Sequence, residues 1–71
     1  MTITKARRDA ARTILANSGV WDASTMMITA DGMVTALRDA NKTYAGSEDA
    51  RCNVASLDEM VTADGQIRPG F

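Results

Sequence analysis

The chain has 71 residues, a formal charge of −1, one cysteine and no histidine, and 45% of its residues are hydrophobic. This length predicts a single small domain over residues 1–71, and the lone Cys52 excludes an intrachain disulfide and is typical of a reducing, cytoplasmic setting. Without histidine the usual zinc ligand and general base are missing, and no run approaches the ~20 apolar residues of a membrane span, so we expect no metal, no cofactor and no membrane contact.

The first predicted element is a helix over residues 4–17. Thr2 or Thr4 can cap its start, and the segment KARRDAARTILAN is rich in alanine and arginine, which favour helices. Gly19 follows and can adopt the left-handed conformation that ends a helix. An apolar stripe at helical spacing, widened by Ala11 and Leu15, is formed by Ile3, Ala6, Ala10 and Ile14.

An eight-residue phrase then occurs twice, as MITADGMV at 27–34 and as MVTADGQI at 60–67, with five identical positions. In the first copy, Asp31-Gly32 separates two runs rich in Met, Ile, Val and Thr. This pattern is a strong hairpin signal because glycine accepts a positive φ, so we predict strands at about 25–29 and 33–37. The alternative is a helix from near Asp22 that ends at Gly32, which would make the fold an all-α three-helix arrangement.

The C-terminal half predicts a second helix after a polar connection over residues 38–46. Residues 47–49 are typical of a helix start, with a capping serine before two acids. Ser56 and Glu59 match a capping box that would instead begin a later, shorter helix. In both versions the second copy of the phrase is expected to end the helix at residues 62–65. The helical stripe consists of Ala50, Val54, Leu57 and Val61.

These elements predict a small α+β domain, in which an N-terminal helix packs on a β-hairpin and a second helix lies toward the C-terminus. The repeated phrase lacks the alternating oxygen ligands and closing glutamate of a calcium loop. Its flanks do not match each other, as a 33-residue solenoid repeat would require. We therefore interpret both copies as turns, with the structural residues Asp31, Gly32, Asp64 and Gly65.

Charge is divided unevenly along the chain. Residues 1–17 carry four basic side chains against Asp9, a balance of +3, and residues 45–67 carry five acids against Arg51, a balance of −4. The basic residues are Lys5, Arg7, Arg8 and Arg12. The acidic residues are Glu48, Asp49, Asp58, Glu59 and Asp64.

No arrangement of catalytic residues is evident, so we expect a protein that is not an enzyme. Asp58 and Glu59 are neighbours whose side chains would point in different directions on a helix, and Cys52 has no histidine with which to pair. The preferred hypothesis is an inhibitor or adaptor of the phage or mobile-element type. It would bind another protein through the acidic surface, in anti-CRISPR, anti-restriction or host-enzyme inhibition. That origin rests on how often small proteins have such roles.

The alternative hypothesis is a DNA- or RNA-binding regulator that uses the basic N-terminal helix. Lys5, Arg8 and Arg12 are three and four residues apart, so they line one helical face and would contact phosphates, with Arg7 at the edge. A homodimer is a further expectation, because a chain of this size has little core of its own and partner packing would add to it.

Overall fold

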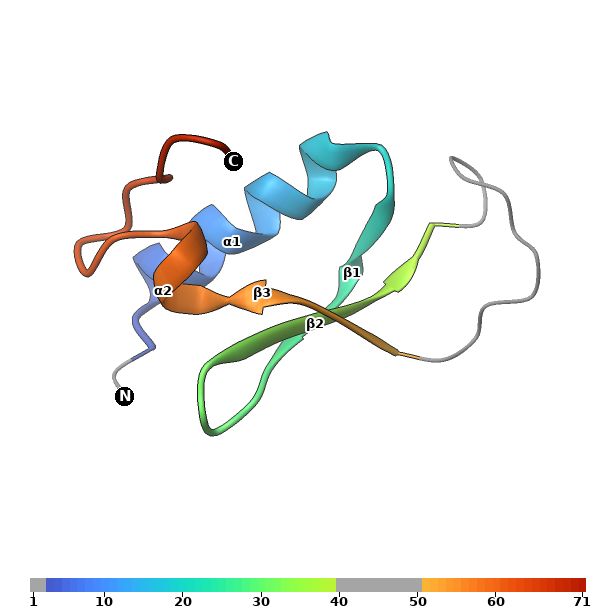
Figure 1. Ribbon diagram of the computed structural model, residues 1–71, viewed down its shortest axis with the longest axis horizontal. Coiled ribbons are helices and arrows are strands. Elements are labelled where there is room, and N and C mark those ends of the chain that lie inside the picture. Colours follow the sequence, from blue (N-terminus) through green and yellow to red (C-terminus); the bar gives the residue numbers. More distant parts are fainter. Residues whose placement is uncertain (1–2, 40–50) are drawn as a thin grey trace.

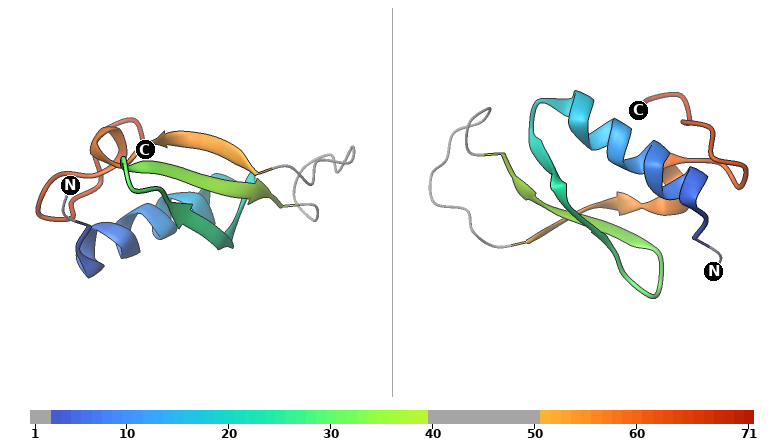
Figure 2. Two further views of the ribbon diagram at one scale, coloured as in Figure 1. Left: turned by 90° about the horizontal axis from the view of Figure 1, so that it is seen from below. Right: turned by 180° about the vertical axis from the view of Figure 1, so that it is seen from behind.

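The computed structural model describes residues 3–39 and 51–71. Three strands form one antiparallel sheet in the order β1-β2-β3, and a helix lies against one face of that sheet (Figures 1 and 2). The predicted small α+β fold is confirmed, and the all-α alternative is wrong. The elements are α1 (Lys5–Ser18), β1 (Trp21–Ile28), β2 (Met33–Arg38), β3 (Cys52–Ser56) and α2 (Leu57–Met60).

Helix α1 lies within one residue of its predicted bounds. The Thr4 hydroxyl accepts a hydrogen bond from the Arg7 backbone N–H at 3.2 Å, which satisfies one of the free donors of the first turn. Gly19 follows the last turn with a φ of 74°, the left-handed conformation that allows the chain to leave the helix and enter β1.

The buried face of α1 differs from the predicted stripe. Ala6 is exposed and Ala10 only half-buried, although both belong to that stripe. A methyl side chain contributes little to burial on either face, so the bulkier Ile14 and Leu15 decide which face turns inward. The residues that face the core are Arg7, Ala11, Ile14 and Leu15.

Strands β1 and β2 form the predicted hairpin, but β1 begins at Trp21 rather than near residue 25. A bulge interrupts the pairing between Asp22 and Met27. At the bulge, the Thr25 hydroxyl accepts a hydrogen bond from the Leu37 N–H at 2.9 Å. This side-chain acceptor replaces a strand carbonyl, so the pairing continues on both sides of the extra residues.

Strand β3 is the element that the sequence interpretation missed. The helical spacing from Ala50 to Val61 predicts a helix here, but Cys52–Ser56 pairs with β2 and places Cys52 opposite Ala36. The capping-box version is the correct one. Ser56 accepts from the Glu59 N–H, and the Glu59 carboxylate accepts from the Ser56 N–H, which starts the four-residue α2. The helix start expected at residues 47–49 lies outside the described residues.

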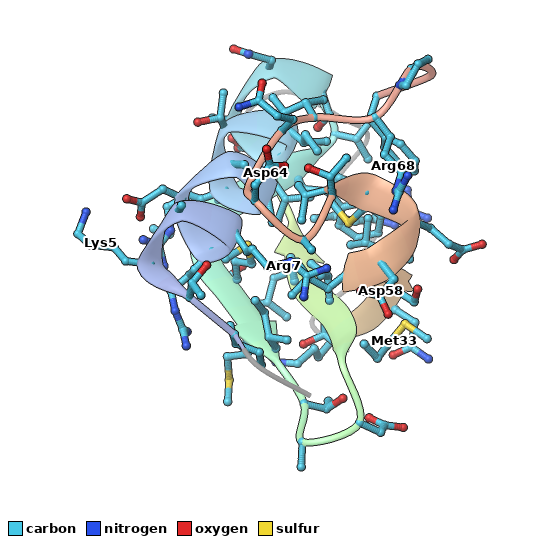
Figure 3. All side chains as sticks on the ribbon, turned by 90° about the vertical axis from the view of Figure 1, so that its left-hand side faces the viewer. Lys5, Arg7, Met33, Asp58, Asp64 and Arg68 are labelled. Carbon is cyan, nitrogen blue, oxygen red and sulfur yellow. The ribbon has the colours of Figure 1, made fainter. Side chains whose placement is uncertain are left out.

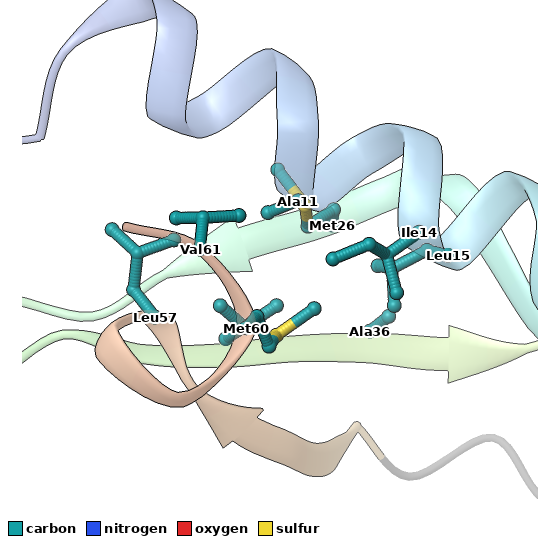
Figure 4. Close-up of a cluster of buried hydrophobic side chains, with 9 residues drawn as sticks. Ala11, Ile14, Leu15, Met26, Ala36, Leu57, Met60 and Val61 are labelled. Atoms are coloured by element: carbon teal, nitrogen blue, oxygen red, sulfur yellow. The ribbon is translucent and has the colours of Figure 1, made fainter. Parts of the chain in front are cut away.

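The core lies between α1, the sheet and α2 (Figure 4). A four-residue helix has almost no stability of its own, so burial of its apolar side chains must hold α2 in place. The Leu57 N–H also donates to the Gly32 carbonyl at 2.8 Å, which joins α2 to the β1–β2 turn. The largest fully buried side chains are Leu15, Val34, Leu57, Met60 and Val61.

Candidate functional site

The first copy of the repeated phrase forms the β1–β2 turn. The Gly32 N–H donates to the Thr29 carbonyl, and the Thr29 N–H donates to the Met33 carbonyl, each at 2.9 Å. Gly32 has a φ of 89°, as expected for a type I turn that is followed by a left-handed glycine. The Thr29 side chain closes the loop, because it donates to the Asp31 carboxylate and accepts from the Met33 N–H.

The second copy forms the same turn, bond for bond. The Gly65 N–H donates to the Thr62 carbonyl at 3.1 Å, and the Thr62 N–H donates to the Gln66 carbonyl at 2.8 Å. The Thr62 hydroxyl donates to the Asp64 carboxylate and accepts from the Gln66 N–H, and Gly65 has a φ of 91°. The prediction that this copy ends a helix is wrong. α2 ends at Met60, and the turn closes an antiparallel bridge further along the chain.

The two turn carboxylates are held by hydrogen bonds from their own loops. The Thr29 hydroxyl lowers the pKa of Asp31, and the Thr62 hydroxyl lowers the pKa of Asp64 in the same way. Across residues 3–39 and 51–71, no three His, Cys, Asp or Glu side chains are grouped closely enough to hold a metal ion. In both copies, therefore, the observed role of the aspartate is to shape the turn.

Arg7 lies inside the fold and holds the C-terminal segment against α1 (Figure 3). Its Nε donates to the Thr62 carbonyl at 3.0 Å, and its Nη2 lies 3.4 Å from the Val61 carbonyl and 2.5 Å from Asp58 Oδ1. The side chain of Arg7 is 7% exposed, whereas that of Asp58 is 62% exposed. The sequence places Arg7 at the edge of a phosphate-binding face, but the structure places it in the core side of the helix.

The acidic residues proposed for partner binding already make contacts within the chain. Asp58 binds Arg7, and Glu59 and Asp64 accept the hydrogen bonds of the capping box and of the second turn. Arg68 adds a second positive charge here, since its Nε donates to the Asp58 carbonyl at 2.6 Å. The acidic charge of this end is therefore partly neutralised. Glu48 and Asp49 lie outside the described residues.

The remaining basic residues of α1, Lys5, Arg8 and Arg12, form a surface that we call the basic stripe. All three are exposed. Lys5 Nζ lies 2.7 Å from the Asp9 carboxylate. Within the part of the chain that the structure describes, the guanidinium groups of Arg8 and Arg12 form no ion pair or hydrogen bond. The stripe thus keeps its charge available to a partner, unlike Arg7.

The basic stripe and the C-terminal segment occupy different flanks of α1. The second turn lies against Ala6, because a Cβ placed on Gly65 would come within 2.9 Å of the Ala6 Cβ. Successive helical residues are rotated by about 100°, so Ala6 points about 100° or more away from every member of the stripe. The described residues carry seven basic and seven acidic side chains, so separation of charge, rather than net charge, distinguishes the two flanks.

Two further arginines, to which the sequence interpretation gave no role, brace the sheet. Arg51 Nη1 donates to the Thr25 carbonyl at 2.6 Å, and the Arg38 guanidinium lies 5.5 Å from the centre of the Trp21 ring. The Arg51 contact spans 26 residues. No local sequence signal could have identified it, because it exists only once β1 and β3 lie on either side of β2.

No family model, curated protein or solved structure matches this chain. No helix among the described residues combines the length and the apolar character needed to cross a membrane. Cys52 is half-buried in β3. The candidate functional site therefore rests on the surface charge of α1 and of the C-terminal segment.

Proposed function

We propose that this protein is a small non-enzymatic binding protein whose basic stripe contacts the phosphate backbone of a nucleic acid. The observation that supports this proposal is the exposure of Arg8 and Arg12, whose guanidinium groups take no part in the described fold. Guanidinium groups form paired hydrogen bonds with phosphate oxygens, and the stripe offers two of them beside the ammonium of Lys5.

The length of the stripe suits a short run of phosphates. Lys5 and Arg12 are seven residues apart, which corresponds to about 10 Å along a helix axis. A nucleic-acid strand carries a phosphate about every 3.4 Å along the duplex axis, so two or three contacts are within reach. Contacts of this kind orient a protein on the backbone without reading bases, so we expect binding with little sequence preference and strong dependence on salt.

A titration of generic DNA and RNA by fluorescence anisotropy at 50 and 200 mM salt tests this proposal. Two to three phosphate contacts predict that the fourfold rise in salt lowers affinity about 10- to 40-fold. In the double variant Arg8→Gln/Arg12→Gln, the loss across the same salt range should shrink to about 4-fold, because at most one contact remains.

The matched control removes two positive charges elsewhere, in the variant Arg38→Gln/Arg68→Gln. Both arginines are exposed and lie outside α1, so wild-type salt dependence is expected. Equal salt dependence in the two double variants would contradict the assignment to the stripe. Absence of binding at 50 mM salt would retire the nucleic-acid proposal altogether.

The second candidate is the inhibitor or adaptor that binds another protein through an acidic surface. The observation in its favour is that Asp58, Glu59 and Asp64 remain exposed on one continuous segment despite their internal contacts. An anti-defence role, or inhibition of a host enzyme, belongs to this candidate. Its partner would present a basic surface, where charge complementarity speeds encounter.

A further inference from the structure

We infer that Asp9 competes with a phosphate partner for Lys5 and thereby limits the affinity of the basic stripe. This inference rests on the proposed nucleic-acid function and adds a residue that regulates it. Lys5 Nζ is 2.7 Å from Asp9 Oδ2, and the side chains of Lys5 and Asp9 are 88% and 50% exposed. The partner's phosphate would replace one anion at Lys5 with another.

The position of Asp9 within the stripe makes this competition local. Residues three and four apart are neighbours on a helix surface, so Asp9 is adjacent to both Lys5 and Arg12. The hydrogen bond from Lys5 lowers the pKa of the Asp9 carboxyl, and the charges of Arg12 and Arg8 act in the same direction. Asp9 is therefore ionised at neutral pH and opposes the positive charge that a polyanion would meet.

The ion pair is exposed enough to exchange. Pairs on the surface contribute little to stability, because water screens their attraction and two long side chains must be ordered. Lys5 can therefore leave Asp9 without disturbing the fold. The other contact of Asp9 uses its backbone carbonyl, which accepts from the Thr13 hydroxyl at 3.0 Å. Asp9→Asn thus removes the charge and keeps that contact.

The test measures binding of a generic 20-base-pair DNA duplex by wild type, Asp9→Asn and the control Asp22→Asn. Asp22 lies on β1, and its Oδ1 accepts from Ser24, an acceptor that asparagine keeps. At 0.1 M salt, release of Lys5 adds about one phosphate contact, which predicts about 8-fold tighter binding and a salt slope steeper by about 0.9. Asp22→Asn should change affinity less than 2-fold.

A double-mutant cycle with Lys5→Gln identifies the partner through which Asp9 acts. In the wild-type background Lys5→Gln should weaken binding little, because Asp9 already occupies the ammonium. In the Asp9→Asn background the same change should weaken binding about 8-fold, since Lys5 then contacts phosphate. Additive effects of the two substitutions would overturn the competition.

The outcomes separate this inference from the function on which it rests. If wild type binds with a salt slope that depends on Arg8 and Arg12, but Asp9→Asn matches wild type in affinity and slope, the stripe stands and the role of Asp9 is overturned. If neither wild type nor Asp9→Asn binds the duplex at 50 mM salt, both proposals are overturned. Circular dichroism of each variant verifies that α1 is intact.

Discussion

Arg7 and Arg8 are identical side chains at adjacent positions, and the fold gives them opposite environments. A rotation of about 100° per residue turns Arg7 toward Ala11 and Ile14, and turns Arg8 toward solvent. The sequence holds a signal for this difference, because Arg7 lies four and seven residues before those two core positions. Treating every arginine of the helix as a surface charge overlooked that spacing.

Replacement of Arg7 by methionine is expected to destabilise the fold by about 2–3 kcal/mol, which is typical for the loss of hydrogen bonds to charged and buried groups. Methionine keeps most of the apolar stem but leaves the carbonyls of Val61 and Thr62 without their donor. Urea denaturation measures the change. Arg8→Met is the matched control and should stay within about 0.5 kcal/mol, as is usual for surface positions. Similar losses in both variants would contradict the structural role of Arg7.

At the scale of elements, the two copies of the repeated phrase adopt one turn in two settings. The first connects paired strands, and the second follows a short helix and folds back onto α1. Every hydrogen bond of the turn joins residues within a five-residue span, so the flanking elements are not needed to define it. The settings differ only in what surrounds the glycine.

Gly65→Ala is expected to destabilise the protein by more than Gly19→Ala. Both glycines have a positive φ, so alanine at either site carries a conformational cost of about 1 kcal/mol. A Cβ at Gly65 would also lie 2.9 Å from the Ala6 Cβ and 3.2 Å from its backbone carbon, whereas a Cβ at Gly19 meets nothing within 4 Å. Thermal unfolding of the two variants provides the comparison. Equal melting temperatures would show that the C-terminal turn is not packed tightly on α1.

The contrast between the hairpin and β3 explains how much of the fold the sequence could predict. Asp31-Gly32 is a local signal, so the β1–β2 hairpin and its turn were accessible from a few residues. β3 is defined by pairing with β2 across the intervening chain, and the spacing of Val54, Leu57 and Val61 is satisfied equally by a helix. Those three side chains are instead divided among β3, α2 and the residue after it.

The same distinction applies to the candidate site. The basic stripe could be predicted, because its members share one face of a helix whose bounds follow from local signals. The internal contacts of Asp58 and Glu59 depend on where α2 begins and on how it meets α1. Those contacts join distant segments, so the sequence could suggest an acidic segment but not how far its charge is neutralised.

At the scale of the whole molecule, the chain returns to its first helix at the end. Val61 is fully buried in the core, and Arg7 and Ala6 contact the segment that follows α2. A fold of this size has a free energy of unfolding of about 4–10 kcal/mol. Burial of one valine contributes about 1.5–3 kcal/mol, and the Arg7 contacts add a similar amount. The C-terminal segment therefore accounts for much of the stability.

Deletion of residues 61–71 is expected to abolish cooperative unfolding, because it removes both Val61 and the carbonyl partners of Arg7. Deletion of residues 69–71 alone should leave a cooperative transition, since these residues are exposed and lie beyond the Val61–Ile67 bridge. Circular dichroism during thermal unfolding distinguishes the two. A cooperative transition in the longer deletion would show that the N-terminal residues fold without this segment.

The repeated turn has one more consequence, for transfer between proteins. A threonine, an alanine, an aspartate, a glycine and one closing residue supply their own donors and acceptors, so the unit carries its own instructions. It tolerates methionine or glutamine at the closing position, because that residue contributes only backbone groups. Such a five-residue cassette is suited to grafting wherever an antiparallel pair of segments needs a short connection, and this chain already contains that graft in duplicate.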